Sequence, residues 1–526
     1  MYDVIVIGAG PGGYRAALNA SKGGLSTLLI DKGEPGIGGV CLNEGCVPTK
    51  TLLYSAKMYD GIVNGAKYGV SAANVAFDHE AVIKRKNKTV RILTAGVKSA
   101  LKDAGVTCLE ARARLRNGSD GLEVVCGSLD GGPGDGAGAG AGAPDARLSD
   151  GAGLSGAGAG DGAGVGAAAG ISAGSGAKPG DGSGAEAGAE ARDGAAVVYK
   201  AKNIVIATGS SAIIPPIKGV AECLSSGYLL TNREALNIPA IPKSLMIIGG
   251  GVIGLEMAYY FACVGTRVIV ADMLPKIGGP LDSELSEALL GELRKKGIDF
   301  ALEARITEIR EGSVVYEQRD ERKEVFSEKA LMSIGRSPNL RGLGLEEAGI
   351  LFERSGIITN DACETNIKGV YAIGDVNGKI TLAHTAYREA DVCVNNILGI
   401  PDAVDYANIP SVIYTNPEIA SVGETEQSAA AKGLEYDVIR LPMRHSGRYL
   451  AENEGGNGIC KIIVSKPGKR LLGAHMIGNY ASEIIYGAGM MIQSEMTAAD
   501  IGKVVFPHPS VGEVIRDAVE AISAKK

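Results

Sequence analysis

The sequence lacks long apolar runs: nowhere do about 18 uncharged apolar residues follow one another, so no membrane-spanning helix is predicted. It also lacks an excess of positive charge, because 60 Asp and Glu residues outnumber 53 Lys and Arg residues. A net charge of -7 does not favour binding to nucleic acid or to an anionic membrane. No basic region or cleavage site precedes the first apolar segment, so we expect a cytoplasmic protein with a small substrate.

Cysteine is also scarce, with nine residues in 526. An odd number spread over a long chain does not fit the disulfide framework of a small secreted domain. Cys41 and Cys46, however, stand five positions apart in GGVCLNEGCVPTK. No histidine or further cysteine lies near them, which disfavours zinc. We therefore expect no metal site and favour a redox role for the pair.

Two segments have the pattern of a parallel βαβ unit, residues 2–31 and 243–273. In each, an apolar strand runs into glycines, then a helix-like stretch, then a second apolar strand. The length suits about three or four domains, and 45% hydrophobic residues can form a sizeable core. The predicted fold class is α/β, with two Rossmann-like nucleotide-binding domains.

Residues 127–194 consist almost wholly of Gly, Ala, Ser and Asp. They offer few large apolar groups to offset the entropy of ordering, so we predict a disordered loop. The flanks, GLEVV and AAVVYKAKNIVIATG, resemble adjacent strands, so the segment enlarges a hairpin turn at a cost of about 2.5 kcal/mol. The alternative, an arm that docks partners, has no aromatic residue to anchor one. Deleting the segment is expected to leave catalysis nearly intact.

The first fingerprint is Gly8-Ala-Gly10-Pro-Gly12-Gly13, with Asp31 ending the next strand. Gly8 suits a tight turn, Gly10 lets the backbone approach a pyrophosphate, and Gly13 lets helix pack on strand. The helix N-terminus supplies free N–H groups and partial positive charge for the pyrophosphate. Asp31 would accept hydrogen bonds from ribose hydroxyls.

The second fingerprint is Gly249-Gly-Gly251-Val-Ile-Gly254, and Asp272 ends the strand after it. Asp272 would repel a 2′-phosphate, and no arginine follows it, so the pattern favours NAD over NADP. Lys276 lies near enough to weaken this argument.

The spacing of Cys41 and Cys46 is too wide for a disulfide within one ideal helix. Cys41 must lie before the helix or in a distorted first turn, and Gly45 gives the backbone room for either. A cysteine at a helix N-terminus has a stabilised thiolate and so a lowered pKa. The alternative is a pair of buried structural thiols.

Outside the Gly/Ala-rich segment, the chain resembles the pyridine nucleotide-disulfide oxidoreductases, a family of flavoproteins. The resemblance follows the order of the family's motifs. These are the Gly8 fingerprint, the Cys41–Cys46 pair, IATGS, the Gly249 fingerprint, GRSPN, TNIKGVYAIGD, PSVIYTNPEIASVG and HPSVGE.

The resemblance implies four parts. These are an FAD-binding domain at 1–240, an NAD-binding domain at 241–338, a central segment completing the FAD site at 339–405, and an α+β dimer-interface domain at 406–526.

Residue roles follow from the same resemblance. For FAD it implies Gly8, Gly10, Gly13, Asp31 at the adenosine ribose, Lys50 by the flavin N5, Thr208, Gly209, Asp375 at the ribityl chain, and Ala383. For NAD it implies Gly249, Gly251, Gly254, Glu256, Asp272 and Gly335. Lys50 would pair with Glu256. His384 is interpreted as structural, and Val40 departs from the family's usual Thr.

The resemblance also assigns the catalytic groups. Cys46 would face the flavin, and Cys41 would exchange with the substrate disulfide. His508, oriented by Glu513, would act as the acid/base across a homodimer interface. Within the family, CLNEGC is closer to enzymes that oxidise dihydrolipoyl groups with NAD⁺ than to glutathione reductases. No C-terminal cysteine pair is present for mercury.

A lipoyl group would then come from a separate carrier protein. Two alternatives stay open: another NADH-dependent disulfide or thiol reductase on the same scaffold, and a protein that serves mainly as a scaffold.

Overall fold

The computed structural model describes residues 1–119, 121–127 and 196–524. The segment predicted to be disordered, 127–194, lies outside these ranges apart from Gly127. Its flanking strands are described: β5 (Gly121–Gly127) pairs antiparallel with β6 (Val197–Ile206), and Cys126 lies opposite Val197. This confirms the prediction that the segment connects two adjacent strands.

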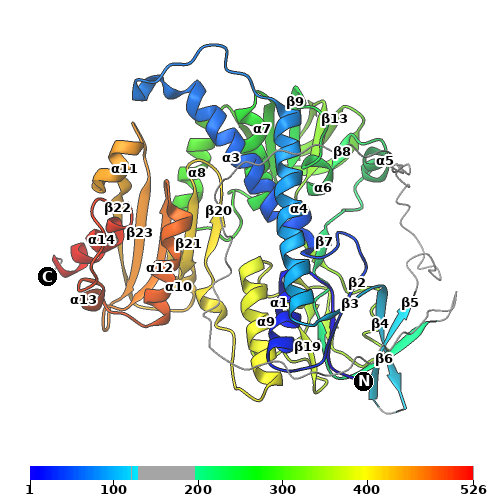
Figure 1. Cartoon of the computed structure of the whole chain (residues 1–526). Helices are drawn as coiled ribbons and strands as arrows, with labels where there is room; N and C mark the ends of the chain where they lie inside the picture. The colour runs from blue at the N-terminus through cyan, green and yellow to red at the C-terminus, as the bar shows by residue number, and fades with distance from the viewer. Residues whose placement is uncertain (120, 128–195, 525–526) are drawn as a thin grey trace, which may run out of the picture. The chain divides into compact units, whose positions relative to one another are not determined.

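A seven-stranded sheet forms around the N-terminal strand β1 (Tyr2–Ile7) (Figure 1). β1 pairs parallel with β2 and β6, and β19 pairs parallel with β6. Val4 to Ile7 are buried because alternate side chains enter two different hydrophobic clusters, one on each face of the sheet. The other strands of this sheet are β2 (Thr27–Asp31), β3 (Thr107–Glu110), β4 (Arg112–Gly118), β5, β6 and β19 (Val370–Ala372).

Helix α1 (Pro11–Lys22) packs lengthwise against α9 (Ala383–Ile397) (Figure 1). The buried residues of α1 are all small: Gly12, Gly13, Ala16, Ala17 and Ala20. Small side chains let the two helices approach closely. This packing places the start of α9 beside the first glycine fingerprint, although the two are more than 350 residues apart.

The second sheet has five strands in the order β11-β10-β9-β15-β8. β9 (Ser244–Ile248) is central and pairs parallel with both β10 and β15. Helix α7 (Val252–Cys263) follows β9 directly, and eight of its residues are buried. The remaining strands are β8 (Leu229–Leu230), β10 (Arg267–Asp272), β11 (Asp299–Leu302) and β15 (Lys329–Met332).

A third sheet, β20-β21-β24-β23-β22, lies in the C-terminal part of the chain and is antiparallel. Its apolar face packs against α12 and α14. The strands are β20 (Ser411–Ile413), β21 (Ile419–Gly423), β22 (Tyr436–Pro442), β23 (Ile459–Ser465) and β24 (Leu471–Ile477). The helices are α10 (Glu426–Ala431), α11 (Gly447–Glu452), α12 (Ala481–Gln493), α13 (Ala498–Ile501) and α14 (Glu513–Ala524).

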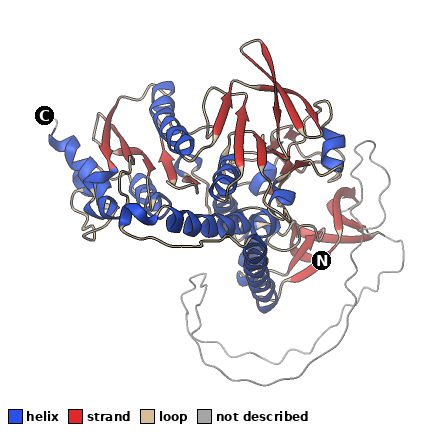
Figure 2. Cartoon of the chain, turned by 90° about the horizontal axis from the view of Figure 1, so that it is seen from above, coloured by secondary structure: helices blue, strands red, loops and turns tan. Residues whose placement is uncertain are grey.

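Shorter strands form further small sheets. β12 (Arg305–Arg310), β13 (Ser313–Gln318) and β14 (Glu321–Phe326) form a meander, β7 (Ser210–Ala212) pairs with β16 (Arg336–Pro338), and β17 (Phe352–Glu353) pairs with β18 (Gly356–Ile357). The other helices are α2 (Gly39–Glu44), α3 (Cys46–Val63), α4 (His79–Asp103), α5 (Val220–Ser225), α6 (Asn232–Ala235) and α8 (Ser283–Lys295). Figure 2 shows helices lying against the sheets, which confirms the α/β class. Among the helices of the described residues, none combines the length and apolar character needed to span a membrane.

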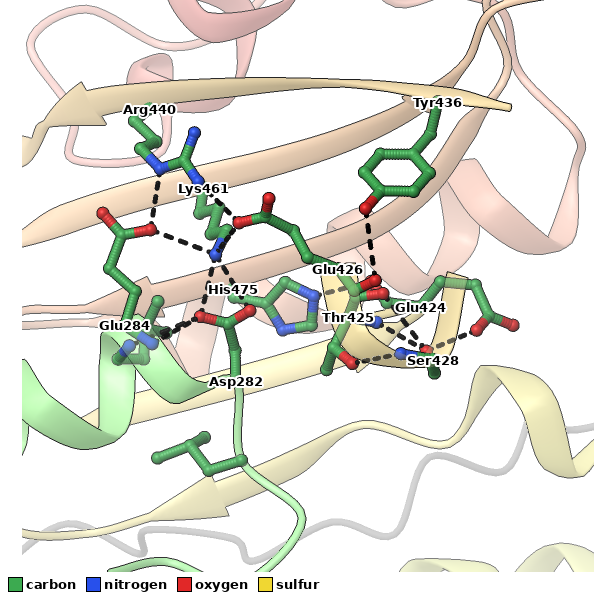
Figure 3. A network of polar contacts seen from close by, with 12 residues as sticks. Asp282, Glu284, Glu424, Thr425, Glu426, Ser428, Tyr436, Arg440, Lys461 and His475 are labelled. Atoms are coloured by element: carbon green, nitrogen blue, oxygen red, sulfur yellow. Dashed lines mark hydrogen bonds and ion pairs between the residues drawn. The ribbon is translucent and has the colours of Figure 1, made fainter. Parts of the chain in front are cut away.

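A cluster of charged side chains around the buried Lys461 and Asp282 connects the start of α8 with the C-terminal sheet (Figure 3). Lys461 on β23 is 1% exposed, and its ammonium lies 2.9 Å from both oxygens of Asp282 and 3.0 Å from Glu284. It also bonds to Glu426, and Arg440 contacts Glu284 and Glu426 at 2.7 and 2.6 Å. Burial alone would lower the pKa of Lys461, but hydrogen bonds to the carboxylates outweigh it and raise that pKa.

Candidate active site

The two close cysteines lie on separate helices. Cys41 is within the short helix α2, and α3 begins at Cys46. Gly45 between them has φ -145° and ψ -108°, which interrupts the helical backbone. The break removes the problem of spacing within one helix, as the sequence predicted, and it puts Cys46 at the positive end of α3.

The two thiols are free but hydrogen-bonded to each other. The pKa of Cys46 falls to about 7, chiefly through the hydrogen bond from Cys41, with help from the positive charge of Lys50. The pKa of Cys41 is raised, first by that same hydrogen bond and then by burial. Cys46, at the N-terminus of α3 and one turn before Lys50, is therefore the sulfur of the pair whose thiolate this environment favours. No group of three or more His, Cys, Asp or Glu residues within the described ranges is arranged for a metal ion.

Lys50, one turn after Cys46, forms the predicted pair with Glu256 of α7. Its ammonium lies 3.0 and 2.9 Å from the two carboxylate oxygens of Glu256. Glu256 is 3% exposed, so its charge needs this partner. The pair brings the helix that follows the second fingerprint against the helix that carries the thiolate.

The first glycine fingerprint has the backbone that its motif requires. Gly8 has φ +103°, and a Cβ there would lie 2.3 Å from the carbonyl oxygen of Ala207. A Cβ on Gly13 would lie 1.8 Å from the oxygen of Gly8. Gly10 instead faces open space, with its nearest neighbour, the Cα of Gly39, 4.0 Å away. Two glycines therefore serve the fold, and Gly10 leaves room for a ligand at the N-terminus of α1.

The second fingerprint repeats this arrangement. Gly249 has φ +106°, and its Cβ would lie 2.4 Å from the oxygen of Ser333. A Cβ on Gly254 would lie 2.1 Å from the oxygen of Gly249. Nothing lies within 4 Å of the Cβ position of Gly251, the residue that precedes α7. Each fingerprint therefore has one open glycine at the start of a helix.

The two acids that end the second strands also match. Asp31 accepts hydrogen bonds from the N–H of Ala9 at 2.8 Å and of Gly33 at 2.9 Å. Asp272 accepts from Gly250 at 2.6 Å and from Leu274 at 2.8 Å. These bonds fix each carboxylate beside its glycine turn and leave further lone pairs for ribose hydroxyls.

Several of the remaining predicted cofactor residues lie just after β6, where segments around residues 339 and 375 contact residues 208–210. Thr208 donates to the carbonyl of Asn339 at 3.0 Å, and Asn339 donates its N–H to Gly209 at 2.9 Å. Asp375 accepts a hydrogen bond from Ser210. Ala383 is the first residue of α9, and Gly335 accepts a hydrogen bond from Ile213 at 3.1 Å. His384 beside Ala383 contacts the carbonyl of Pro410 at 2.7 Å, consistent with a structural role.

His508 and Glu513 also come together. The Nδ1 atom of His508 lies 2.9 Å from Glu513, and Ser510 donates its N–H to the other oxygen of Glu513 at 2.8 Å. The backbone bond from Ser510 is the main reason that the pKa of Glu513 is lowered. The His508 side chain is 80% exposed. No contact recorded among the described residues joins it to Cys41 or Cys46.

Sequence reasoning missed several residues of this site. Arg336 donates to the hydroxyl of Ser210 at 2.8 Å, next to Asp375. Tyr14 and Tyr387 share a hydroxyl–hydroxyl bond of 2.5 Å near Cys41. The sequence could have indicated three of them, because they lie within or next to recognised motifs: Ser210, Arg336 and Tyr14. Tyr387 lies on α9 and had no local signal.

Comparisons with known proteins give the family. A model described as pyridine nucleotide-disulphide oxidoreductase matches residues 2–127 and 181–390. The model of the dimerisation domain of the same proteins matches residues 409–519. The chain belongs to the pyridine nucleotide-disulphide oxidoreductase family.

Relatives within this family are similar over nearly their full length. The dihydrolipoyl dehydrogenase of Geobacillus stearothermophilus is 32% identical over 524 residues, covering 98% of this chain and 95% of the relative. The mitochondrial dihydrolipoyl dehydrogenase of Pisum sativum is 31% identical over 527 residues, covering 99% and 91%.

Solved structures agree on the oxidoreductase fold. LpdA from Mycobacterium tuberculosis has a TM-score of 0.79 at 22% identity and covers 99% of each chain. The HOCl-induced flavoprotein disulfide reductase RclA from Escherichia coli has a TM-score of 0.76 at 22% identity and covers 99% of this chain.

Proposed function

We propose that this protein is a dihydrolipoyl dehydrogenase that uses FAD and NAD⁺. The observation that carries the proposal is the Cys41–Cys46 pair at the broken start of α3, one turn before the Lys50–Glu256 ion pair, in a chain with two dinucleotide-binding turns. The full-length similarity to dihydrolipoyl dehydrogenases supports the choice of substrate. Oxidation of a dithiol needs such a reactive sulfur pair and an electron acceptor beside it.

The residues present fit both cofactors. Gly10 and Gly251 each leave open space at a helix N-terminus, where a pyrophosphate binds to free N–H groups. FAD held at the first of these turns would supply a two-electron acceptor for the reduced cysteines, and NAD⁺ held at the second would be the final acceptor. Asp272 disfavours a 2′-phosphate, and the Lys276 ammonium donates instead to the carbonyl of Leu281 at 2.6 Å. This geometry supports NAD over NADP.

The cysteines carry out the thiol exchange. In the oxidised protein a substrate thiolate attacks the sulfur of Cys41, the Cys41–Cys46 bond breaks, and Cys46 leaves as a thiolate. The second substrate thiolate then attacks the substrate sulfur of the mixed disulfide and releases Cys41, which takes up a proton. The products are a substrate disulfide and two reduced cysteines. The lowered pKa of Cys46 makes it the better leaving group.

His508 supplies the base for the substrate thiol in this proposal. Its side chain is 80% exposed and makes no recorded contact with Cys41 or Cys46 among the described residues, which suits a role at the thiols of a second subunit, because the dimerisation domain supports a homodimer. Exposed Tyr486 and Met490 on α12 provide apolar surface for such an interface. The lipoyl group would be presented by a separate carrier protein.

Steady-state assays with alternative substrates test this function. The purified holoprotein should oxidise dihydrolipoamide with NAD⁺ and, in reverse, should reduce lipoamide with NADH faster than glutathione disulfide or coenzyme A disulfide. A negligible lipoamide rate beside a fast rate with either other disulfide would reject the proposed substrate. A pure protein without bound flavin would reject the mechanism as well.

Gly251→Ala is expected to weaken NAD⁺ binding without unfolding the protein. The backbone of Gly251 suits alanine, and nothing occupies the space that the Cβ would enter. A methyl group there would meet the pyrophosphate and raise the KM for NAD⁺ about tenfold, a loss of about 1.4 kcal/mol. Gly291→Ala on α8, also in open space, is the control and should leave the KM unchanged. An equal KM for both variants would contradict the assigned NAD site.

His508→Gln is expected to slow dihydrolipoamide oxidation about a hundredfold near neutral pH, because the substrate thiol loses its base. Reduction of the protein by NADH should keep its rate, since that half-reaction does not involve the substrate thiol. His445→Gln, which removes another exposed histidine of the C-terminal part, is the control. Stopped-flow measurement of the two half-reactions separates them, and matching rates for both variants would exclude His508 as the base.

A further inference from the structure

We propose that Tyr414 is a positioning residue that fixes the Lys50 ammonium between its own ring and the Glu256 carboxylate, and so controls the charge that Cys46 experiences. This inference rests on the redox function proposed above for the cysteine pair. Tyr414 lies in the loop between β20 and β21, in the C-terminal part of the chain and far in sequence from both partners.

Tyr414 makes two contacts with the pair. Its backbone N–H donates to the Glu256 carboxylate at 3.0 Å, and the Lys50 ammonium lies 4.4 Å from the centre of its ring. Burial raises the pKa of the Tyr414 hydroxyl to about 12, so the ring is neutral at physiological pH. The ring therefore attracts Lys50 through its π face rather than as a phenolate.

The segment 410–418, which contains β20 and the loop that carries Tyr414, is held on both sides. At one end, the carbonyl of Pro410 contacts His384 at the start of α9. At the other end, the Glu418 carboxylate accepts from the N–H and hydroxyl of Ser482 on α12 at 3.1 and 2.8 Å. The same helix bears the apolar face assigned to the dimer. The contacts with α9 and α12 hold the backbone on either side of Tyr414, as the support of a positioning residue requires.

Lys50 needs such positioning because a lysine ammonium on a flexible stem is a mobile charge. Lys50 is one-third exposed, so water competes with Glu256 for it. The positive charge of Lys50 lowers the pKa of Cys46, whereas the negative charge of Glu256 raises it. If the Lys50 ammonium moved into solvent, the Cys46 thiolate would still be near the negative charge of Glu256 but would lose the stabilising positive charge of Lys50.

Several other groups affect Cys46. The charged and titratable groups whose interaction with Cys46 is resolved are Cys41, Lys50, Glu256, Arg336, Tyr387 and Tyr414. Because Tyr414 is neutral, its expected influence on the thiol passes through Lys50. A direct effect of Tyr414 on Cys46 and an effect through Lys50 can be told apart by measurement.

The test measures the pKa of Cys46 in the reduced holoprotein from the pH dependence of its alkylation by iodoacetamide, with the Cys41 and Cys46 peptides quantified separately. The wild-type pKa should be near 7. Tyr414→Leu should raise it by about half a unit, the size of one partly exposed cation–π contact. Tyr414→Phe keeps the ring face and should restore the wild-type value.

Two further variants make the test specific. Tyr54 lies on the same helix as Lys50, and the guanidinium of Arg85 lies 5.6 Å from the centre of its ring. Tyr54→Leu therefore removes a different cation–π contact and should not change the pKa of Cys46. Lys50→Met should raise the pKa, and adding Tyr414→Leu to Lys50→Met should raise it no further. An unchanged pKa in Tyr414→Leu, or an equal rise with and without Lys50, would overturn the proposal. Neither result depends on lipoamide turnover, which tests the proposed function separately.

Discussion

Replacing Cys46 with serine is expected to reduce NAD⁺-dependent oxidation of dihydrolipoamide by about a thousandfold or more. Serine cannot form the disulfide that accepts the substrate electrons, and a hydroxyl does not ionise near pH 7 as this thiol does. The helix break at Gly45 and the Lys50–Glu256 pair would remain. The loss would therefore reflect the missing sulfur rather than a changed fold.

Anaerobic reduction followed by absorption spectroscopy provides the measurement. Wild-type protein should develop a long-wavelength thiolate-to-flavin band, and Cys46→Ser should lack it while keeping its yellow colour. Cys41→Ser should lose turnover but keep the band, because the Cys46 thiolate is still present. Cys108→Ser, at an exposed thiol away from the site, is the control. A band that persists in Cys46→Ser and disappears in Cys41→Ser would reverse the two assigned roles.

Lys461→Met is expected to lower the free energy of unfolding by about 3–5 kcal/mol. The change removes one buried cation and leaves Asp282, which is 0% exposed, without its ion-pair partner (Figure 3). Arg440 still contacts Glu284 and Glu426 but has no recorded contact with Asp282. The buried carboxylate then keeps the backbone N–H bonds from the start of α8, with His475 close by but without an ammonium partner.

Urea denaturation of the holoprotein tests this expectation, with Lys432→Met as the matched control. Lys432 pairs with Glu424 in the same part of the chain, but its side chain is 55% exposed. Loss of an exposed pair should cost no more than about 1 kcal/mol. Equal denaturation midpoints for the two variants would show that the buried cluster contributes little beyond an ordinary surface pair.

Local requirements made much of the site predictable. Gly8 and Gly249 were identified as the first glycines of the two fingerprints, and both have the positive φ that suits the tight turn. The helix break between Cys41 and Cys46 followed from their spacing and from Gly45. The pairing of Lys50 with Glu256 needed the family resemblance, because nothing near either residue in the sequence indicates the other.

Contacts between distant segments were not predictable in this way. Tyr414 was part of a recognised motif, yet its two contacts with the Lys50–Glu256 pair come from a loop more than 150 residues from either partner. Lys461 lies on β23, and no motif in the sequence singled it out. Its ion pairs depend on how α8 meets the C-terminal sheet.

The sequence by itself determined the two nucleotide turns, the broken helix at the cysteines and the α/β class, because backbone conformation and hydrophobic periodicity depend on neighbouring residues. Only the tertiary structure decided which charges are buried together, as Lys461 and Asp282 are, and which distant groups reach the cysteine site. A pKa depends on charges and hydrogen bonds within a few ångströms. Cys41 and Lys50 affect Cys46 from neighbouring positions in the sequence, whereas Glu256 and Tyr414 come from segments that only packing brings together.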